Sequence, residues 1–258
     1  MRIFRSIILI INYKTLLIMG LVVTATAICH EHEIIADFPL TVVSIAIVFP
    51  IVFSINSAFR RRETALKYLS DFKVHGQCIY YAARDWNNGQ ASHLAPEIKA
   101  VISNCLEGLK TFFLSKKVDA REREKEVYEH FSQLSKLVEQ LREHGISGGE
   151  LSRVNQYQSK MMVAFDNMKI IYHYRTPLTL RAYSKVFIYT FPFLYGPSFA
   201  GAFGDNSVEW LGYILPVIIS FIIASLDNIQ DHLENPYDQI GEDDIKIDLE
   251  ELDDMLCT

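Results

Sequence analysis

Three long, mostly apolar stretches stand out in the pattern of hydrophobic and polar positions. They cover Pro39–Phe59, Tyr183–Phe203 and Val208–Leu226. A helix needs about 20 mostly apolar residues to cross a membrane, so each stretch predicts a membrane span. Pro50 would bend the first of them, but membrane helices tolerate proline where neighbouring groups satisfy the freed carbonyl.

The N-terminal region predicts a further span over residues 13–29. A secretory signal peptide is the alternative interpretation, because Arg2 and Arg5 precede the apolar run and residues 25–27 (Ala-Thr-Ala) resemble a cleavage site. Residues 12–14 interrupt the apolar core, however, and another span follows after about a dozen residues. We therefore expect four uncleaved spans in total.

Positive charges predict how these spans are oriented. With four spans, one side of the membrane receives nearly all basic residues that flank them: Arg2, Arg5, Arg60, Arg61, Arg62, Arg175, Arg181 and Lys185. The short loops on the other side, "HEHEIIAD" and "GDNSVEW", are acidic or neutral. Positive charge stays in the cytoplasm, so we expect both termini and the long middle segment to be cytoplasmic.

The middle segment predicts amphipathic helices. Residues 94–117 and 121–145 carry apolar side chains at helical spacing, and the turn at Ser147 opens another helix that reaches about Tyr172. No strand pattern of useful length is visible, so the fold class is all-α. The domain plan is N-terminal membrane helices over 1–62, a cytoplasmic helical region over 63–180, membrane helices over 181–228 and an acidic cytoplasmic tail over 229–258.

Composition and charge exclude several functions. Half of the residues are hydrophobic and 22% are charged, which fits a chain with both membrane and water-exposed parts. The net charge of −6 gives no basic footprint for nucleic acid. No metalloprotease motif, phosphate-binding glycine loop or nucleophile elbow is present. We therefore expect no enzyme activity and no cofactor.

Neither the cysteines nor the acidic tail predicts a metal site. Four scattered cysteines, Cys29, Cys78, Cys105 and Cys257, form no ligand spacing and are interpreted as free thiols. In the tail, Glu242, Asp243 and Asp244 do not form the twelve-residue loop of an EF-hand. A solvated acidic turn is the favoured interpretation, and calcium binding by these three acids stays open.

The tail also carries an alternating pattern. Ile245, Ile247 and Leu249 alternate with charged residues. We expect the segment from Asn235 to Leu252 to pack against a neighbouring subunit, or else to be a solvated acidic extension.

Several segments resemble the bestrophin family, and bacterial bestrophins in particular. "FPLTVVSIAIVFPIVFSINSAFRRRE" is similar to the family's second membrane helix. "RTPLTLRAYSKVFIYTFPFLYG" looks like the entry to its third, and "LDNIQDHLENPYDQIGEDDIKIDLEEL" is similar to the segment that follows its last span. The resemblance runs in order over nearly the whole chain.

The resemblance implies a homopentamer around one central pore, with four spans per subunit. It places an apolar neck at Ile45, Phe49 and Phe53 of the second membrane helix. It places a cytoplasmic aperture at Leu178, after Pro177. A departure is that Pro50 lies inside the neck segment.

The function implied is passive ion conduction across a cell membrane, most simply a bacterial inner membrane. Aromatic ring edges are positive and favour anions such as chloride, whereas the acidic cytoplasmic surface favours cations. The expected partners are further copies of the chain, permeant small ions and the lipid bilayer. A membrane-anchored scaffold is the alternative from another class. A carrier is disfavoured because no inverted repeat is visible.

Overall fold

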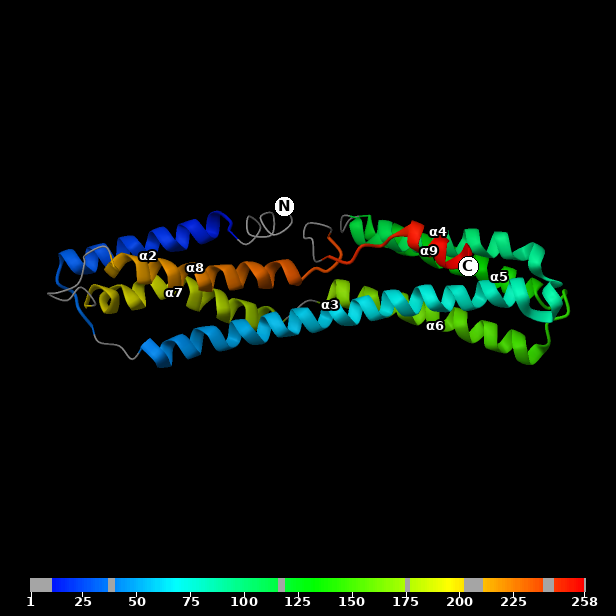
Figure 1. Ribbon diagram of the computed structural model, residues 1–258, viewed down its shortest axis with the longest axis horizontal. Coiled ribbons are helices and arrows are strands. Elements are labelled where there is room, and N and C mark those ends of the chain that lie inside the picture. Colours follow the sequence, from blue (N-terminus) through cyan, green and yellow to red (C-terminus); the bar gives the residue numbers. More distant parts are fainter. Residues whose placement is uncertain are drawn as a thin grey trace. The chain divides into compact units, whose positions relative to one another are not determined.

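The computed structural model describes residues 11–36, 40–115, 119–174, 177–201, 211–238 and 244–257. All of its regular elements are helical, and no strand occurs within those ranges. Figure 1 shows the α-helices α2 (Tyr13–Glu31), α3 (Leu40–Asp85), α4 (Ala95–Leu114), α5 (Ala120–Gln140), α6 (Gly148–His173), α7 (Leu178–Gly201), α8 (Leu211–Leu233) and α9 (Leu249–Cys257). The expected all-α fold class is confirmed.

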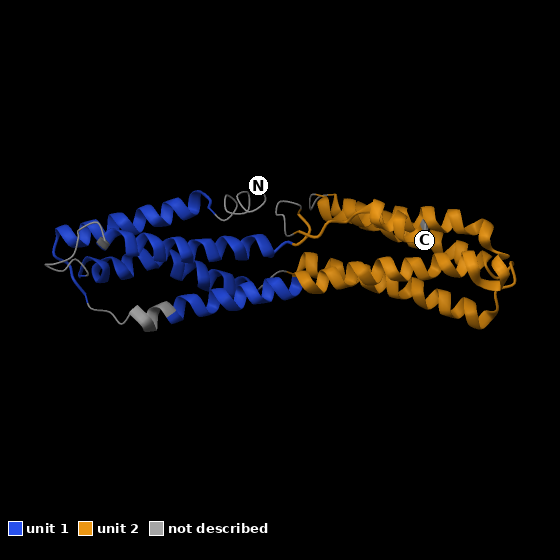
Figure 2. Cartoon of the chain, viewed as in Figure 1, with its two compact units in different colours: residues 1–61, 175–235, 240–243 blue, residues 62–174, 236–239, 244–258 orange. Residues whose placement is uncertain are grey.

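The chain divides into two compact units, coloured separately in Figure 2. Unit 1 comprises residues 1–61, 175–235 and 240–243, and unit 2 comprises residues 62–174, 236–239 and 244–258. Helix α3 therefore contributes its first part to unit 1 and its last part to unit 2. The division into four parts, with two on the cytoplasmic side, stays a prediction, because the two compact units are defined by packing and say nothing about a membrane.

Unit 1 packs α2, α7, α8 and the first part of α3 around an apolar core. Its fully buried members include Val22 of α2, Ile51 of α3 and Ile188 of α7. Helices α2 and α7 approach closely at Gly196, where an added Cβ would lie 3.3 Å from the Ala25 carbonyl carbon. The missing side chain thus lets the two helices pack backbone to backbone.

Two helices of the described residues, both in unit 1, are long and apolar enough to cross a membrane: Tyr13–Glu31 and Gly212–Leu233. They overlap the first and fourth predicted spans, although residues 208–210 of the fourth lie outside the described residues. The second predicted span begins at residue 39 and the third ends at residue 203, both outside the described residues. The loop predicted between spans three and four, "GDNSVEW" at 204–210, also lies outside them.

Unit 2 is a second helical bundle with its own core. The periodicity of the middle segment is confirmed by α4, α5 and α6, whose apolar faces meet around side chains such as Phe72, Phe131 and Phe165. Helix α6 begins with a capping box in which Ser147 and Glu150 exchange hydrogen bonds. Gly145, with φ +79°, ends the preceding turn.

The C-terminal segment packs on its own chain, which corrects the expectation that it packs against a neighbouring subunit. Ile245, Ile247, Leu252 and Leu256 are buried in the core of unit 2. The alternative of a solvated extension is wrong too. The alternation of Ile245 and Ile247 was a sound signal of docking, but a sequence pattern does not say which copy of the chain supplies the surface.

Polar contacts hold α9 in place along its outer side. Lys73 forms an ion pair with Glu251, and Lys99 lies 3.5 Å from Asp253. The Gln77 side-chain amide donates to the Met255 carbonyl at 2.9 Å. Charged residues of the tail thus face basic residues of unit 2 while its apolar residues face the core.

Candidate pore face and polar cluster

Helix α3 presents three large apolar side chains on one exposed face of unit 1. Ile45, Phe49 and Phe53 are 59%, 60% and 53% exposed. Positions i, i+4 and i+8 lie one helical turn apart on the same side. Ile47 and Ile51, on the opposite side, are buried in the core of unit 1. Helix α3 is therefore anchored by one face and leaves the predicted neck residues free of that core.

The two phenylalanines of this face contact each other. Their ring centroids lie 4.5 Å apart and their planes are inclined by 87°. In this edge-to-face geometry the positive edge of one ring meets the negative face of the other. Pro50 lies between the two residues within α3, which continues through it.

Leu178, the predicted aperture residue, is the first residue of α7 and is 79% exposed. The Pro177 carbonyl accepts hydrogen bonds from the backbone N–H groups of Leu180 and Arg181, which starts the helix. The structure thus places Leu178 at a helix terminus rather than on the α3 face. Its role as an aperture stays a prediction.

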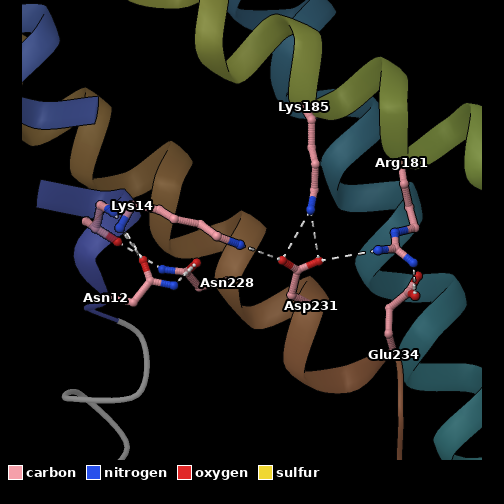
Figure 3. Close-up of polar contacts among 8 residues, drawn as sticks. Asn12, Lys14, Arg181, Lys185, Asn228, Asp231 and Glu234 are labelled. Carbon is pink, nitrogen blue, oxygen red and sulfur yellow. Dashed lines mark hydrogen bonds and ion pairs between the residues drawn. The ribbon is translucent and has the colours of Figure 1, made fainter. Parts of the chain in front are cut away.

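A cluster of polar side chains at the ends of α2, α7 and α8 was missed by the sequence analysis. We call it the α8 polar cluster, and its members are Asn12, Lys14, Thr15, Arg181, Lys185, Asp227, Asn228, Gln230, Asp231 and Glu234. Figure 3 shows the side chains from α2 and α7 converging on α8. The signal was present: residues 227, 230, 231 and 234 follow the spacing of one helix face.

Hydrogen bonds tie α2 to α8 within this cluster. The Asn12 side chain accepts from the backbone N–H groups of Lys14 and Thr15 and so caps α2. Its amide group donates to the Asn228 side chain at 2.7 Å, and Asn228 donates to the Thr15 hydroxyl at 2.9 Å. Asn12 therefore both caps α2 and joins α2 to α8.

Ion pairs tie α7 to α8. Arg181 donates to Glu234 at 2.7 Å, and Glu234 is 4% exposed. Lys185 lies 3.4 Å from Asp231. Lys14 of α2 also forms an ion pair with Asp231, at 3.4 Å. Lys14, Lys185 and Arg181 thus lie around the partly exposed carboxylate of Asp231 (Figure 3).

Some buried polar atoms of the cluster have no hydrogen-bond partner within the described chain. They are Nε of Arg181, one oxygen each of Asp227 and Glu234, and both polar atoms of the Gln230 side chain, which is fully buried. Buried polar groups normally find a protein or water partner. This part of unit 1 is therefore strongly polar inside an otherwise apolar bundle.

A second polar network lies in unit 2, between α5 and α6. Lys169 contacts Glu124, Asp166 and the Tyr128 hydroxyl, each at 2.8 Å. Burial alone would raise the pKa of Asp166, but the hydrogen bonds from Lys169 and Tyr128 outweigh it and lower that pKa. Burial and the bond to Asp166 raise the pKa of Tyr128. The network joins two helices by charge-assisted bonds.

No group of three or more His, Cys, Asp or Glu side chains among the described residues could hold a metal ion. Glu242 and Asp243 of the predicted acidic turn lie outside those residues, so the question of calcium stays open. Cys29, Cys78 and Cys105 are free thiols.

Comparison with known proteins gives a clear answer for the fold alone. No family model and no curated protein matches the sequence. A crystal structure of a bacterial bestrophin homologue from Klebsiella pneumoniae, in a substituted form, superposes with a TM-score of 0.80 at 15% identity. The match covers 95% of this chain and 97% of that one. The chain has the bestrophin fold.

Two further structures agree. The Klebsiella bestrophin homologue solved by zinc phasing gives a TM-score of 0.77 at 15% identity, over 95% of this chain and 98% of that one. A structure described as a membrane protein gives 0.79 at 16% identity, over 96% and 100%. The resemblance noted from sequence motifs is thus confirmed as a bestrophin-like fold over nearly the whole chain.

Proposed function

We propose that this chain is the subunit of a bestrophin-type ion channel. Five copies surround a central pore in a bacterial inner membrane, and each copy crosses the membrane four times with both termini in the cytoplasm. Conduction is passive, and no cofactor or metal takes part. The observation that carries the proposal is the α3 face, which exposes Ile45, Phe49 and Phe53 on a bestrophin-like fold.

The three side chains suit a pore neck for a physical reason. Four residues advance a helix by about 6 Å, so five copies would form three apolar rings over roughly 12 Å of pore wall. Ions shed water poorly, and a narrow apolar ring therefore acts as a gate by dewetting. In a single chain, such a face would simply be exposed to solvent or lipid.

Leu178 would form a second and shorter constriction. It follows Pro177 at the first turn of α7 and its side chain is 79% exposed, so a ring of five leucines could form without repacking unit 1. Being a single ring, it would act on ion preference more than on gating.

The proposed permeant ions are anions such as chloride. Phe49 and Phe53 are exposed on this face, and one of the two rings turns an edge to the face of the other. The remaining positive ring edges would attract an anion. The purified protein in a planar bilayer with asymmetric salt tests this directly, because the sign of the reversal potential reports the charge of the permeant ion.

Each outcome of that recording is decisive. A reversal potential near the chloride equilibrium value supports the proposal. A value near the cation equilibrium potential makes the protein a cation-conducting channel. No current from protein that has demonstrably inserted as a pentamer leaves a membrane-anchored scaffold as the function and overturns the channel.

A further inference from the structure

Two lysines of the α8 polar cluster have more N–H donors than there are acceptor groups around them. Lys14 of α2 and Lys185 of α7 both face Asp231, at 3.4 Å, and their side chains are 31% and 32% exposed. An ammonium carries three N–H donors, and charge-assisted bonds to carboxylates are normally about 2.7–2.9 Å long. Neither ammonium makes another hydrogen bond or ion pair within the described chain.

The third cation of the cluster is differently placed. Arg181 donates to Glu234 at 2.7 Å and lies 4.0 Å from Asp231. Its charge is therefore matched by a carboxylate of its own, whose side chain is only 3% exposed. The third carboxylate of the cluster, Asp227, is 5% exposed. The solvent-exposed surface therefore presents two ammonium groups, which share the single exposed carboxylate of Asp231.

Exposed apolar side chains continue from both lysines along their helices. On α7, Tyr189 and Phe193 follow Lys185 at i+4 and i+8 and are 41% and 66% exposed. On α2, Leu17 follows Lys14 at i+3 and is 50% exposed. Residues at these spacings share one side of a helix. A cationic end thus leads into an apolar surface on two helices that pack together.

This pattern matches one kind of ligand, an amphiphile with an anionic head and acyl chains. We propose that Lys14 and Lys185 bind the phosphate of an anionic phospholipid, whose acyl chains lie along Leu17, Tyr189 and Phe193. Two ammonium groups can each donate to a different phosphate oxygen. Basic residues at the cytoplasmic ends of membrane helices bind anionic lipid headgroups in this way.

The inference rests on the proposed membrane placement of α2 and α7, but not on ion conduction. A zwitterionic lipid fits less well, because its own positive group would lie near the two exposed ammonium groups. Asp231 competes with the phosphate for both ammonium groups, so its removal should strengthen lipid binding. That direction is the opposite of the one expected if the cluster only holds helices together.

The test measures lipid retention by native mass spectrometry. The full chain is purified from micelles that contain equal amounts of phosphatidylglycerol and phosphatidylcholine. We expect the parent protein to retain phosphatidylglycerol in preference. The double variant Lys14→Gln/Lys185→Gln should lose at least about fivefold of that preference, and Asp231→Asn should increase it.

Two controls keep the test sharp. Lys125→Gln removes an exposed lysine of α5 in unit 2, whose side chain is 79% exposed, and should leave retention unchanged. Lys14→Arg/Lys185→Arg keeps both charges and should restore binding, which separates loss of the site from misfolding. Glycerol phosphate at millimolar concentration should not displace the lipid.

The contrary results are equally plain. Equal retention of both lipids by the parent protein, or equal preference in the parent and the double glutamine variant, overturns the lipid site. Full displacement by glycerol phosphate makes it a site for soluble phosphate instead. A protein that does not insert into liposomes at all contradicts the proposed membrane placement, which is a separate failure.

Discussion

The Arg181 guanidinium of α7 and the carboxylate of Glu234, the residue after α8, form a 2.7 Å ion pair in which the Glu234 side chain is only 3% exposed. The pair joins the first turns of one helix to the end of another. Because Glu234 is buried, its charge depends on Arg181 for compensation. A buried carboxylate without its partner is strongly unfavourable.

Arg181→Met should therefore destabilise unit 1 by about 3 kcal/mol, since it strands a buried charge. The double variant Arg181→Met/Glu234→Met should recover most of this loss. Unfolding in mixed detergent, followed by circular dichroism, measures both values. Arg123→Met, which breaks an exposed pair with Glu126 on α5, should cause no measurable change. If the single and double variants are equally unstable, the pair is not what couples α7 to α8.

The docked tail gives a prediction for unit 2. Leu252 is fully buried, so Leu252→Ala should lower the free energy of unfolding by about 2–5 kcal/mol. Glu250→Ala, two residues away on the exposed side of α9, should change it by less than about 0.5 kcal/mol.

Because the tail packs on its own chain, this loss should not depend on protein concentration. Denaturant unfolding at two concentrations tenfold apart measures it. A loss that grows on dilution would mean that the tail packs on a neighbouring subunit after all.

Cysteine reactivity gives a prediction that depends on pH. Burial raises the pKa of Cys105 to about 12, and the side chain is fully buried in unit 2. The thiolate is the reactive form, so Cys105 should stay unmodified by iodoacetamide at pH 8 in the folded protein and react on unfolding. Mass spectrometry of the labelled peptides, with the less buried Cys29 as reference, measures this. Modification of Cys105 at the rate of Cys29 would contradict its burial.

The sequence predicted the helices better than it predicted their contacts. Periodicity found α4, α5 and α6 because each buries one apolar face, and that signal is local. From the sequence, Asp231 and Glu234 fall in the acidic tail over 229–258, because they look like surface charges until Lys14 and Arg181 are brought to them. In the chain, Arg181 lies 53 residues before Glu234, and Lys14 lies 217 residues before Asp231.

The predicted neck also shows that a local pattern predicts a helix face but not what that face contacts. Helical spacing puts Ile45, Phe49 and Phe53 on one side of α3, but spacing alone does not say whether that side faces the core. The structure shows it exposed and shows Ile47 and Ile51 buried instead. What covers the exposed side in an assembly depends on other copies of the chain, which no pattern within one sequence specifies.

The α3 face is the central claim, and its matched control lies on α8. Ile218 and Ile222 are also one turn apart and are 48% and 50% exposed, so Ile218→Ala/Ile222→Ala shortens exposed side chains at a similar exposure and spacing. We predict no change in current for this control, because these residues would face lipid or a neighbouring helix.

Single-channel recording of the triple variant Ile45→Ala/Phe49→Ala/Phe53→Ala, reconstituted beside the parent and the α8 control, tests the account most directly. Smaller side chains should widen and wet the neck, so conductance or open probability should rise while the pentamer stays intact. A triple variant that assembles as a pentamer, yet gives currents of the same size, gating and selectivity as the parent, would contradict the assignment of this face to a pore.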